Sequence, residues 1–528
     1  MSEVAVGPLE PLTCFSAWDL LEAAAVLGTG QESPVRPDVG AAQGFSAQLN
    51  RLDSESRLLT LSVVEWAYQA AGREPMMFGA PLPSPAPELD ATAASHRAGE
   101  HLQVLLTEHR GRSLGEWIEV AVRGGFRAPD RLLPVLLDFL REHRRWRSEG
   151  VRVLGERGRW LARLNPEWSF IAGAGDPEEF AESSHESRVL TIAALRGRDP
   201  MRARELVQAA WKEEPCQRRA DLLGALLTGL SMADEPFLEG CLSERGKDVR
   251  AKAAELLSRL IGSRLCQRMK ERAGPTLRFT TKTFIGLGGA RIEVRLPELC
   301  NASMIRDGIE PKPPQARLGE KAWWLLQILG ATPLTYWVEV WRARPGHIVE
   351  ALAGNEFEET IFEGWLLAAE RQRDAAWANE LLLHWPPRRP DLLARSLAIL
   401  PEKQREEEVC RRIEENLESG AMIHPLEALL PAMELAWGEN LGRQVLKFLQ
   451  RYATQDDKLD PGTLEALIAQ ASGRLPPALA GEVVEGWPLP EHLGSSVHRA
   501  LEQLFYWVDF RAQMLKVLKC ADSLATSR

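Results

Sequence analysis

The densest group of side chains able to do chemistry is a basic segment between residues 141 and 163. It contains eight arginines and three glutamates, with tryptophans interleaved among them. Guanidinium groups bind phosphates and carboxylates and also stack on aromatic rings. The segment therefore predicts a cationic, stacking surface for phosphate or for an acidic partner. The residues predicted to bind a partner are Arg144, Arg145, Trp146, Arg157 and Arg159.

The same segment has a second interpretation, in which the tryptophans face a core and the arginines line solvent. Surface arginines of this kind pair with acidic groups elsewhere and bury their stems along apolar surface. The formal net charge of the whole chain is −10, which favours this second interpretation. A negative chain also argues against general nucleic-acid binding and against docking on anionic lipid.

Other signatures of catalysis or metal binding are missing from the sequence. The ten histidines are dispersed, and His96 and His101 have no carboxylate partner at metal-binding spacing. The glycine-rich stretch 286–289 matches no phosphate-binding motif and lies between two predicted strands. We therefore predict no catalytic, cofactor-binding or metal-binding residues and expect no enzyme activity. An acid–base pair assembled by the fold would leave no such signature.

The cysteine pattern and the lengths of the apolar runs indicate in which cellular compartment the protein is expected. The seven cysteines occur singly, and the first residues show neither a basic region nor an apolar region typical of a signal peptide. This pattern predicts reduced thiols in a cytoplasm. The longest apolar runs, such as residues 132–140, are about half as long as a membrane span, so we expect no membrane segment.

The elements that must position the basic segment are helices. Three consecutive segments, 199–211, 222–230 and 248–260, carry apolar residues at helical spacing. Helices that are apolar on one side must bury that side against neighbouring helices. The three stripes consist of Ala203, Leu206, Val207, Ala210 and Trp211; of Leu222, Leu223, Leu226, Leu227 and Leu230; and of Val249, Ala253, Leu256, Leu257 and Leu260.

Stacked antiparallel helix pairs are the unit of an α-solenoid. The segments repeat at a shorter spacing than the ~40–47 residues of regular HEAT units, so the pattern predicts a HEAT-like α-solenoid with tight turns. Residues Ala253 and Ala254 are small enough to allow close helix packing. The fold class predicted from these features is mainly α.

The periodicity changes to two around residues 277–296, where apolar and polar residues alternate on both sides of the glycines. This pattern predicts one small β-hairpin inserted between helical regions. A lone hairpin is marginal in water and must pack on helices or on another chain. The predicted domains are an N-terminal helical domain 1–170, HEAT-like repeats 171–274, the hairpin with a proline-rich linker 275–316, and a C-terminal helical array 317–528.

Three stretches resemble a known family. They are the run from Trp18 to Thr29, the run from Leu154 to Trp168, and the block from Asp199 to Glu239. Together they are similar to the bacterial domain-of-unknown-function family DUF5691. The resemblance implies HEAT-like helical packing and no assigned enzyme activity. It also implies gene neighbours that include MoxR-type AAA+ ATPases, von Willebrand factor A domain proteins and SWIM zinc-finger proteins.

We therefore expect a non-catalytic cytoplasmic scaffold or adaptor that binds a protein partner along a groove. The resemblance implies that this partner is a MoxR-type AAA+ ATPase or one of its companion proteins. Two alternatives stay open. One is a nucleic-acid-binding HEAT-like protein, which would need a continuous basic face. The other is an enzyme with an unrecognised site between the two helical halves.

Overall fold

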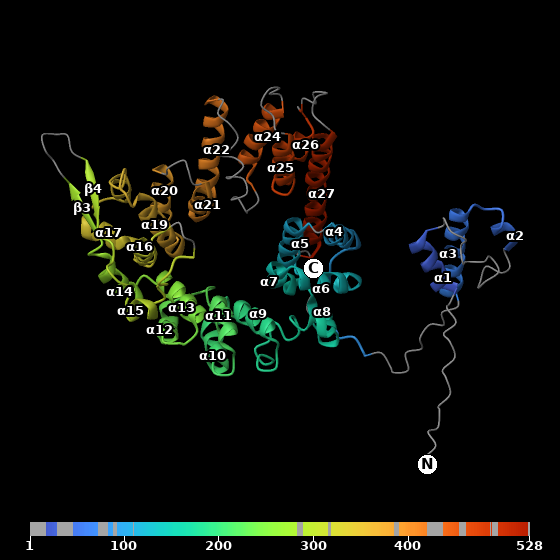
Figure 1. Cartoon of the computed structure of the whole chain (residues 1–528), viewed down its shortest axis with the longest axis horizontal. Helices are drawn as coiled ribbons and strands as arrows, with labels where there is room; N and C mark the ends of the chain where they lie inside the picture. The colour runs from blue at the N-terminus through green and yellow to red at the C-terminus, as the bar shows by residue number, and fades with distance from the viewer. Residues whose placement is uncertain are drawn as a thin grey trace, which may run out of the picture. The chain divides into compact units, whose positions relative to one another are not determined.

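Helices dominate the computed structural model of the 528-residue chain (Figure 1). The prediction of a mainly α fold is confirmed. The strands among the described residues form two small sheets of two strands each. The structure describes residues 17–28, 46–71, 83–87, 92–108, 110–281, 289–314, 318–384, 390–419, 437–453, 461–485, 487 and 495–525.

The chain divides into two compact units, the first ending at Ser84 and the second beginning at Pro85. This division falls inside the domain 1–170 that was expected from the sequence. The first unit contains α1 (Ala17–Leu27), α2 (Ser46–Leu49) and α3 (Ser54–Ala71). These helices bury a small apolar core of their own, made of Leu21, Leu49 and Leu61.

The second unit begins with a helical group whose local signals are clear. The hydroxyl of Ser95 caps α4, and Pro134 occupies the first turn of α6, where its missing N–H is tolerated. The two-residue strands β1 (Thr92–Ala93) and β2 (Phe126–Arg127) pair in parallel. The helices are α4 (His96–Thr107), α5 (Gly111–Arg123), α6 (Leu133–Glu142), α7 (Arg147–Gly150) and α8 (Gly155–Leu164).

The middle of the second unit contains the three helices predicted from apolar stripes. They are α10, α11 and α13, and Leu226 and Leu256 on two of the stripes are buried as predicted. The prediction for Leu227 was wrong: this side chain is 41% exposed, because α11 ends at Ala225 before the stripe is complete. The bounds are α9 (His185–Arg196), α10 (Pro200–Ala210), α11 (Cys216–Ala225), α12 (Glu235–Cys241), α13 (Lys247–Arg259) and α14 (Arg264–Ala273).

The predicted hairpin is confirmed. Strands β3 (Leu277–Thr281) and β4 (Ala290–Val294) are antiparallel, with Leu277 opposite Val294. The hairpin packs on helices, since the ring of Phe279 stacks on that of Trp341 at 5.4 Å. Of the glycine stretch between the strands, residues 286–288 lie outside the described residues. The predicted linker after the hairpin contains one short helix, α15 (Ala302–Arg306).

The second half of the chain returns to helices. Its first helices extend the core that contains Leu226 and Leu256, and its later helices form a separate core. Trp337, Trp365 and Trp377 are buried and in edge-to-face contact along one line. The helices are α16 (Glu320–Gly330), α17 (Leu334–Trp341), α18 (Pro345–Glu350), α19 (Glu358–Gln372), α20 (Ala375–Leu383), α21 (Pro390–Ile399), α22 (Glu402–Ser419), α24 (Glu439–Ala453), α25 (Pro461–Ser472), α26 (Ala480–Val483) and α27 (Ser495–Ala525).

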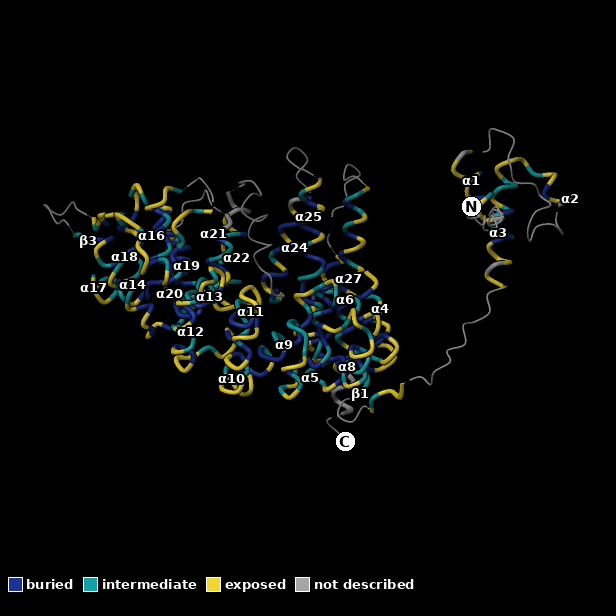
Figure 2. The backbone as a smooth tube through the Cα atoms, turned by 60° about the horizontal axis from the view of Figure 1, so that its bottom comes forward, coloured by how far each residue is buried: buried dark blue, intermediate teal, exposed yellow. Residues whose placement is uncertain are grey.

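Contacts within the second unit run from helix to helix along the chain and then return to its beginning. Helix α13 packs on α19, α19 on α16, α20 and α21, and α25 on α27. Helix α27 then contacts α4 and α5, beside which it lies in Figure 1. Its residues Trp507 and Met514 are buried in the same core as Leu102 and Trp117. Buried residues gather where helices face one another, and the outer turns of α10 and α12 are exposed (Figure 2).

Candidate functional site

Part of the basic segment predicted from the sequence is neutralised in the folded chain. Arg157 forms an ion pair with Asp130, and Arg159 forms one with Glu156. Arg147 is buried and donates hydrogen bonds to the carbonyl oxygens of Leu140 and Arg141. Arg147 and Arg157 therefore connect separate parts of the chain, whereas Arg159 pairs within its own helix α8.

The five residues predicted to bind a partner come from two separate elements. Arg144, Arg145 and Trp146 form a 3₁₀ turn, whereas Arg157 and Arg159 lie on α8. The Trp146 ring packs directly against Gly111 and Gly115 of α5, so it belongs to a helix contact. The guanidinium of Arg145 lies 5.3 Å from the centre of that ring, and Arg144 is exposed.

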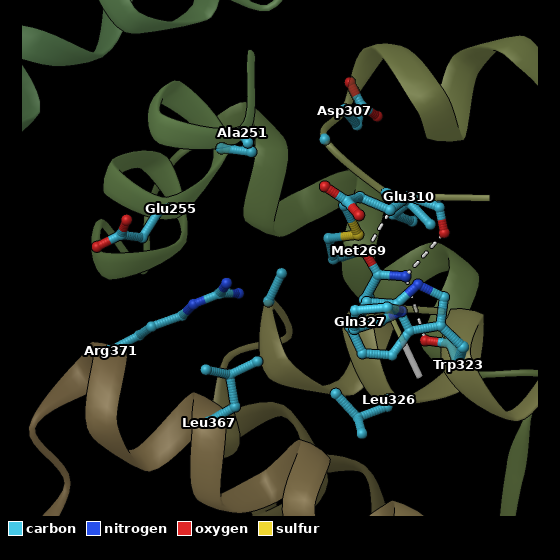
Figure 3. A pocket seen from close by; sticks show the side chains of 15 residues that line it. Ala251, Glu255, Met269, Asp307, Glu310, Trp323, Leu326, Gln327, Leu367 and Arg371 are labelled. Atoms are coloured by element: carbon cyan, nitrogen blue, oxygen red, sulfur yellow. Dashed lines mark hydrogen bonds between the residues drawn. The ribbon is translucent and has the colours of Figure 1, made fainter. Parts of the chain in front are cut away.

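A better candidate is a groove between helices α13 and α19, which we call the α13–α19 groove. It consists of two adjoining hollows of about 290 Å³ and 510 Å³, which share Ala251, Glu255, Leu367 and Arg371. The larger hollow extends toward α11, and the smaller extends toward α16 and the segment 307–314. Figure 3 shows the smaller hollow, with Arg371 reaching from α19 toward its interior.

Small residues open this groove. Ala251 and Ala254 lie on the side of α13 that lines it, and their methyl groups leave space between the helices. The segment after α15 approaches α13 so closely that a Cβ on Gly308 would lie 2.4 Å from that of Ala254. Gly308 also has a φ of +87°, which glycine adopts without strain. Two observations therefore favour glycine at position 308: a side chain would collide with Ala254, and the backbone has a positive φ.

Glu255 is the charged residue of α13 that lines both hollows, beside Asp248, Lys252 and Arg259, which line the larger one. Its carboxylate accepts hydrogen bonds from Lys252 at 2.6 Å and from Arg259 at 3.2 Å. Burial raises the pKa of Glu255, but these two cations outweigh burial and lower the pKa below its usual value. Glu255 is therefore ionised at neutral pH and already paired.

On the α19 side, Arg371 lines both hollows, and Glu370, which pairs with Arg395, lines the larger one. Arg371 donates a hydrogen bond to the carbonyl oxygen of Gly330 at 2.9 Å, while its Nε is buried without a hydrogen-bond partner among the described residues. Burial lowers the pKa of Arg371 to about 10, so the guanidinium keeps its charge at neutral pH. The indole Nε1 of Trp323 is likewise buried and has no partner within the described part of the chain. Buried donors normally have a hydrogen-bond acceptor. The groove therefore contains two donors whose acceptor is missing among the described residues.

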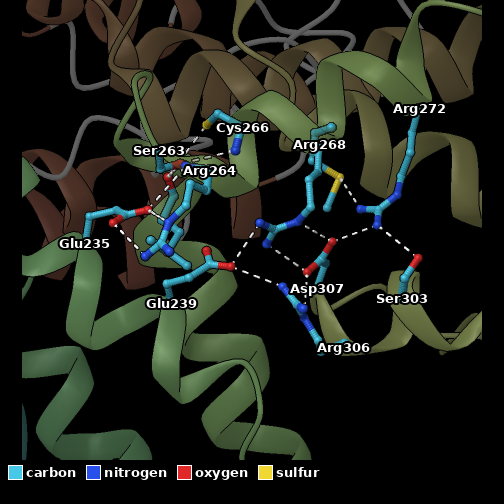
Figure 4. Close-up of polar contacts among 12 residues, drawn as sticks. Glu235, Glu239, Ser263, Arg264, Cys266, Arg268, Arg272, Ser303, Arg306 and Asp307 are labelled. Atoms are coloured by element: carbon cyan, nitrogen blue, oxygen red, sulfur yellow. Dashed lines mark hydrogen bonds and ion pairs between the residues drawn. The ribbon is translucent and has the colours of Figure 1, made fainter.

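A polar network fixes the segment that closes one side of the groove (Figure 4). Asp307 accepts hydrogen bonds from Arg268 at 2.8 Å and pairs with Arg272 at 2.7 Å. Glu239 of α12 joins the network through Arg268 and Arg306. Burial raises the pKa of Asp307, but its hydrogen bonds from Arg268 and Arg272 outweigh burial and lower it. The network therefore connects α12, α14 and α15 and holds the 307–310 backbone against α13.

The groove offers recognition chemistry. It combines an apolar floor of small residues with buried donors and paired charges at the edge, which suits carbonyl oxygens and small apolar groups.

Among the described residues, no group of three His, Cys, Asp or Glu side chains is placed to hold a metal ion. Within the same part of the chain, no helix is both long and apolar enough to cross a membrane.

A comparison with protein families identifies the chain. The model of a family of unknown function, DUF5691, matches residues 20–518. The chain belongs to this family. The resemblance inferred from the three sequence stretches is confirmed. The DUF5691 match includes every residue of the α13–α19 groove. No curated protein and no solved structure matches the chain significantly.

Sequence reasoning missed Glu255 and Arg371 as groove residues. A partial signal was present in α13, where the neighbouring alanines indicated close packing. Arg371 carries no local signal, because its importance comes from a contact between helices more than a hundred residues apart in the DUF5691 chain. Such a contact follows from the packing of α13 on α19, which periodicity does not specify.

Proposed function

We propose that this chain is a non-catalytic scaffold that binds a segment of a partner protein in the α13–α19 groove. The observation that carries the proposal is the groove itself, with Arg371 Nε and Trp323 Nε1 buried and without partners among the described residues. An unsatisfied buried donor costs about 1–3 kcal/mol, and a bound acceptor removes that cost. The carbonyl oxygens of a peptide backbone are suitable acceptors.

The arrangement of helices supports the same proposal. Many helices that are neighbours in the chain contact one another in the second unit, which supports our proposal of a HEAT-like array. Such arrays offer extended surfaces for partner proteins. The paired charges of Glu255, Lys252 and Arg259 leave the groove edge without a strong excess of either sign. A segment with small apolar side chains therefore fits the groove better than a highly charged one.

The partner that we propose is a MoxR-type AAA+ ATPase or one of its companions, a von Willebrand factor A domain protein or a SWIM zinc-finger protein. The family resemblance supports this choice. A scaffold without a nucleotide-binding motif would depend on such a partner for ATP chemistry. We place the interaction in the cytoplasm, in agreement with the seven cysteines that occur singly along the chain.

Co-purification with a matched pair of variants tests the groove. Ala251→Gln fills the groove with a longer side chain that helices tolerate well. Ala209→Gln makes the same change on the exposed side of α10, away from the groove. We expect the wild type and Ala209→Gln to retain the same partner protein from the native host and Ala251→Gln to lose it.

Two results would contradict the proposal. The first is an Ala251→Gln chain that retains the partner as well as the wild type does. The second is a wild-type chain that retains no protein but shows intrinsic hydrolase or nuclease activity. That second result would favour an enzyme with an unrecognised site.

A further inference from the structure

A second hollow of about 530 Å³ lies away from the α13–α19 groove, where α7 and α8 meet α9. Three arginines line it: Arg152, Arg159 and Arg198. They come from three separate places in the chain, since Arg152 follows α7, Arg159 lies on α8 and Arg198 follows α9. The fold therefore brings together cations that are up to 46 residues apart in the sequence.

The charge of this hollow is poorly compensated. Arg152 and Arg198 have no ion pair within the described part of the chain, and no Asp or Glu is among the residues that line the hollow. Arg159 pairs through one terminal nitrogen with Glu156, a residue of its own helix. Its Nε is buried and has no hydrogen-bond partner among the described residues. Three arginines thus line a hollow that no carboxylate lines.

The wall of the hollow is held in place by buried contacts. The backbone N–H of Gly175 donates a hydrogen bond to the hydroxyl of Thr191, which is buried on α9. Gly175 has a φ of +88°, and a Cβ at this position would lie 3.9 Å from a terminal nitrogen of Arg159. A glycine therefore lets the loop turn beside the guanidinium without strain. These contacts fix the Gly175 side of the hollow.

The chemistry of the lining defines a ligand class. Guanidinium groups bind phosphate oxygens in pairs, through short, charge-assisted hydrogen bonds. The hydroxyl of Ser148 adds a polar group, and Val151 and Leu190 add an apolar wall. The volume lies within the ~300–1,000 Å³ of small-molecule pockets and exceeds what a single phosphate needs.

We propose that this hollow, the Arg152–Arg198 pocket, binds a small organic phosphate. The three arginines hold the phosphate group, and the apolar wall contacts the organic part. The proposal goes beyond the scaffold function and is independent of it, because no residue of this pocket lines the α13–α19 groove. The sequence indicated this chemistry at Arg159, whereas Arg198 lies outside the basic segment and becomes relevant through the fold.

Titration calorimetry on the full chain tests the proposal, with phenyl phosphate as the principal probe and inorganic phosphate as the second. We expect saturable binding at one site, with phenyl phosphate several-fold tighter because it also covers apolar wall. Arg152→Gln and Arg198→Gln should each weaken phenyl phosphate binding by about tenfold, the usual effect of losing one charge-assisted hydrogen bond.

Arg144→Gln is the matched control, because Arg144 is also exposed and without an ion pair among the described residues but does not line the pocket. It should bind phenyl phosphate as the wild type does. Neither Arg152 nor Arg198 has an ion pair with a described residue to lose, so all three variants should unfold at the same temperature as the wild type.

Four results would overturn the proposal. They are the absence of saturable phenyl phosphate binding to the wild type, equal weakening in Arg144→Gln, unchanged binding in both pocket variants, and benzoate binding as tightly as phenyl phosphate. The last result would indicate a general anion site. A phosphoserine tripeptide is the final probe. Tighter binding of this peptide than of phenyl phosphate is a fifth result against the proposal, because it would assign the pocket to a phosphorylated protein segment.

Discussion

At the scale of single residues, a buried ion pair between Arg196 and Asp234 removes two charges from water. Both side chains are fully buried, and the Arg196 guanidinium donates to both carboxylate oxygens at 3.1 and 2.8 Å. It also donates to the carbonyl oxygens of Thr228 and Gly229, while Arg204 binds the same carboxylate. Such a pair is tolerated in a core because nearly every donor and acceptor is satisfied.

The first prediction concerns the pH dependence of this pair. Burial raises the pKa of Asp234, but hydrogen bonds from Arg196 and Arg204 outweigh it and lower the pKa from 3.8. A lowered folded-state pKa means that the carboxylate stabilises the fold above pH 3.8 and loses this effect as the pH falls through the folded-state pKa. We expect Asp234→Asn to lower the free energy of unfolding by about 3–5 kcal/mol at pH 7.

Urea unfolding from pH 7 down to pH 3 measures this effect. The difference between wild type and Asp234→Asn should be constant above about pH 5 and shrink as the pH falls below 3.8. Glu485→Gln is a suitable control, because this carboxylate is exposed. A difference between wild type and Asp234→Asn that grows on acidification would contradict the prediction.

The second prediction compares two leucines that both lie on predicted apolar stripes but differ in burial. Leu256 is buried in the core, and Leu227 is 41% exposed. Leu256→Ala should lower the free energy of unfolding by about 2–5 kcal/mol, since it removes buried methyl groups and leaves a cavity. Leu227→Ala should change it by less than about 0.5 kcal/mol. Denaturant titration of the two variants compares them directly, and equal losses would show that both stripes are buried to the same extent.

At the scale of elements, periodicity predicted much of the fold because it reports which side of a segment is apolar. It identified α10, α13 and the hairpin β3–β4. It failed at Leu227, because the end of α11 depends on a turn at Leu226 and not on the apolar pattern. It also could not place the candidate site, since Arg371 meets α13 through helix packing that no local spacing encodes.

The third prediction uses two helical glycines with opposite surroundings. A Cβ on Gly115 of α5 would lie 2.5 Å from the Trp146 ring, whereas a Cβ on Gly224 of α11 would meet nothing within 4 Å. Gly224→Ala should stabilise the protein by about 0.4–1 kcal/mol, because alanine reduces the entropy of the unfolded chain. Gly115→Ala should instead destabilise it by about 1–3 kcal/mol through overpacking.

Thermal unfolding of the two variants measures the difference. The shifts in midpoint temperature should have opposite signs, although both substitutions improve helix propensity equally. A third variant, Trp146→Leu combined with Gly115→Ala, should recover part of the stability lost in Gly115→Ala, because the smaller side chain leaves room for the new methyl group. An increase in stability in Gly115→Ala alone would show that Trp146 does not pack tightly on α5.

At the scale of the whole second unit, the most informative feature is the contact between its last helix and its first ones. In an open repeat array each unit contacts its neighbours alone, so elements far apart in the sequence are not coupled. Here α27 packs on α4 and α5, and its residues share a core with them. Repeat spacing in a sequence describes neighbours, and it therefore gave no indication of this long-range contact.

The fourth prediction tests whether this contact couples the two ends of the second unit. Arg511 of α27 is fully buried; its Nε donates to Glu116 of α5 at 2.8 Å, and another nitrogen donates to the carbonyl oxygen of Leu475 at 2.6 Å. Replacing it with alanine leaves Glu116 without this partner and should cost about 3–5 kcal/mol locally. Hydrogen exchange should then accelerate in both α5 and α27, while α13 keeps its wild-type rates. Arg511 and Glu116 are 395 residues apart in the sequence.

Arg499→Ala, on the exposed side of α27, is the control and should leave the hydrogen-exchange rates of α5 unchanged. Acceleration confined to α27 in Arg511→Ala would show that α5 is stable without the contact and that the two ends behave independently.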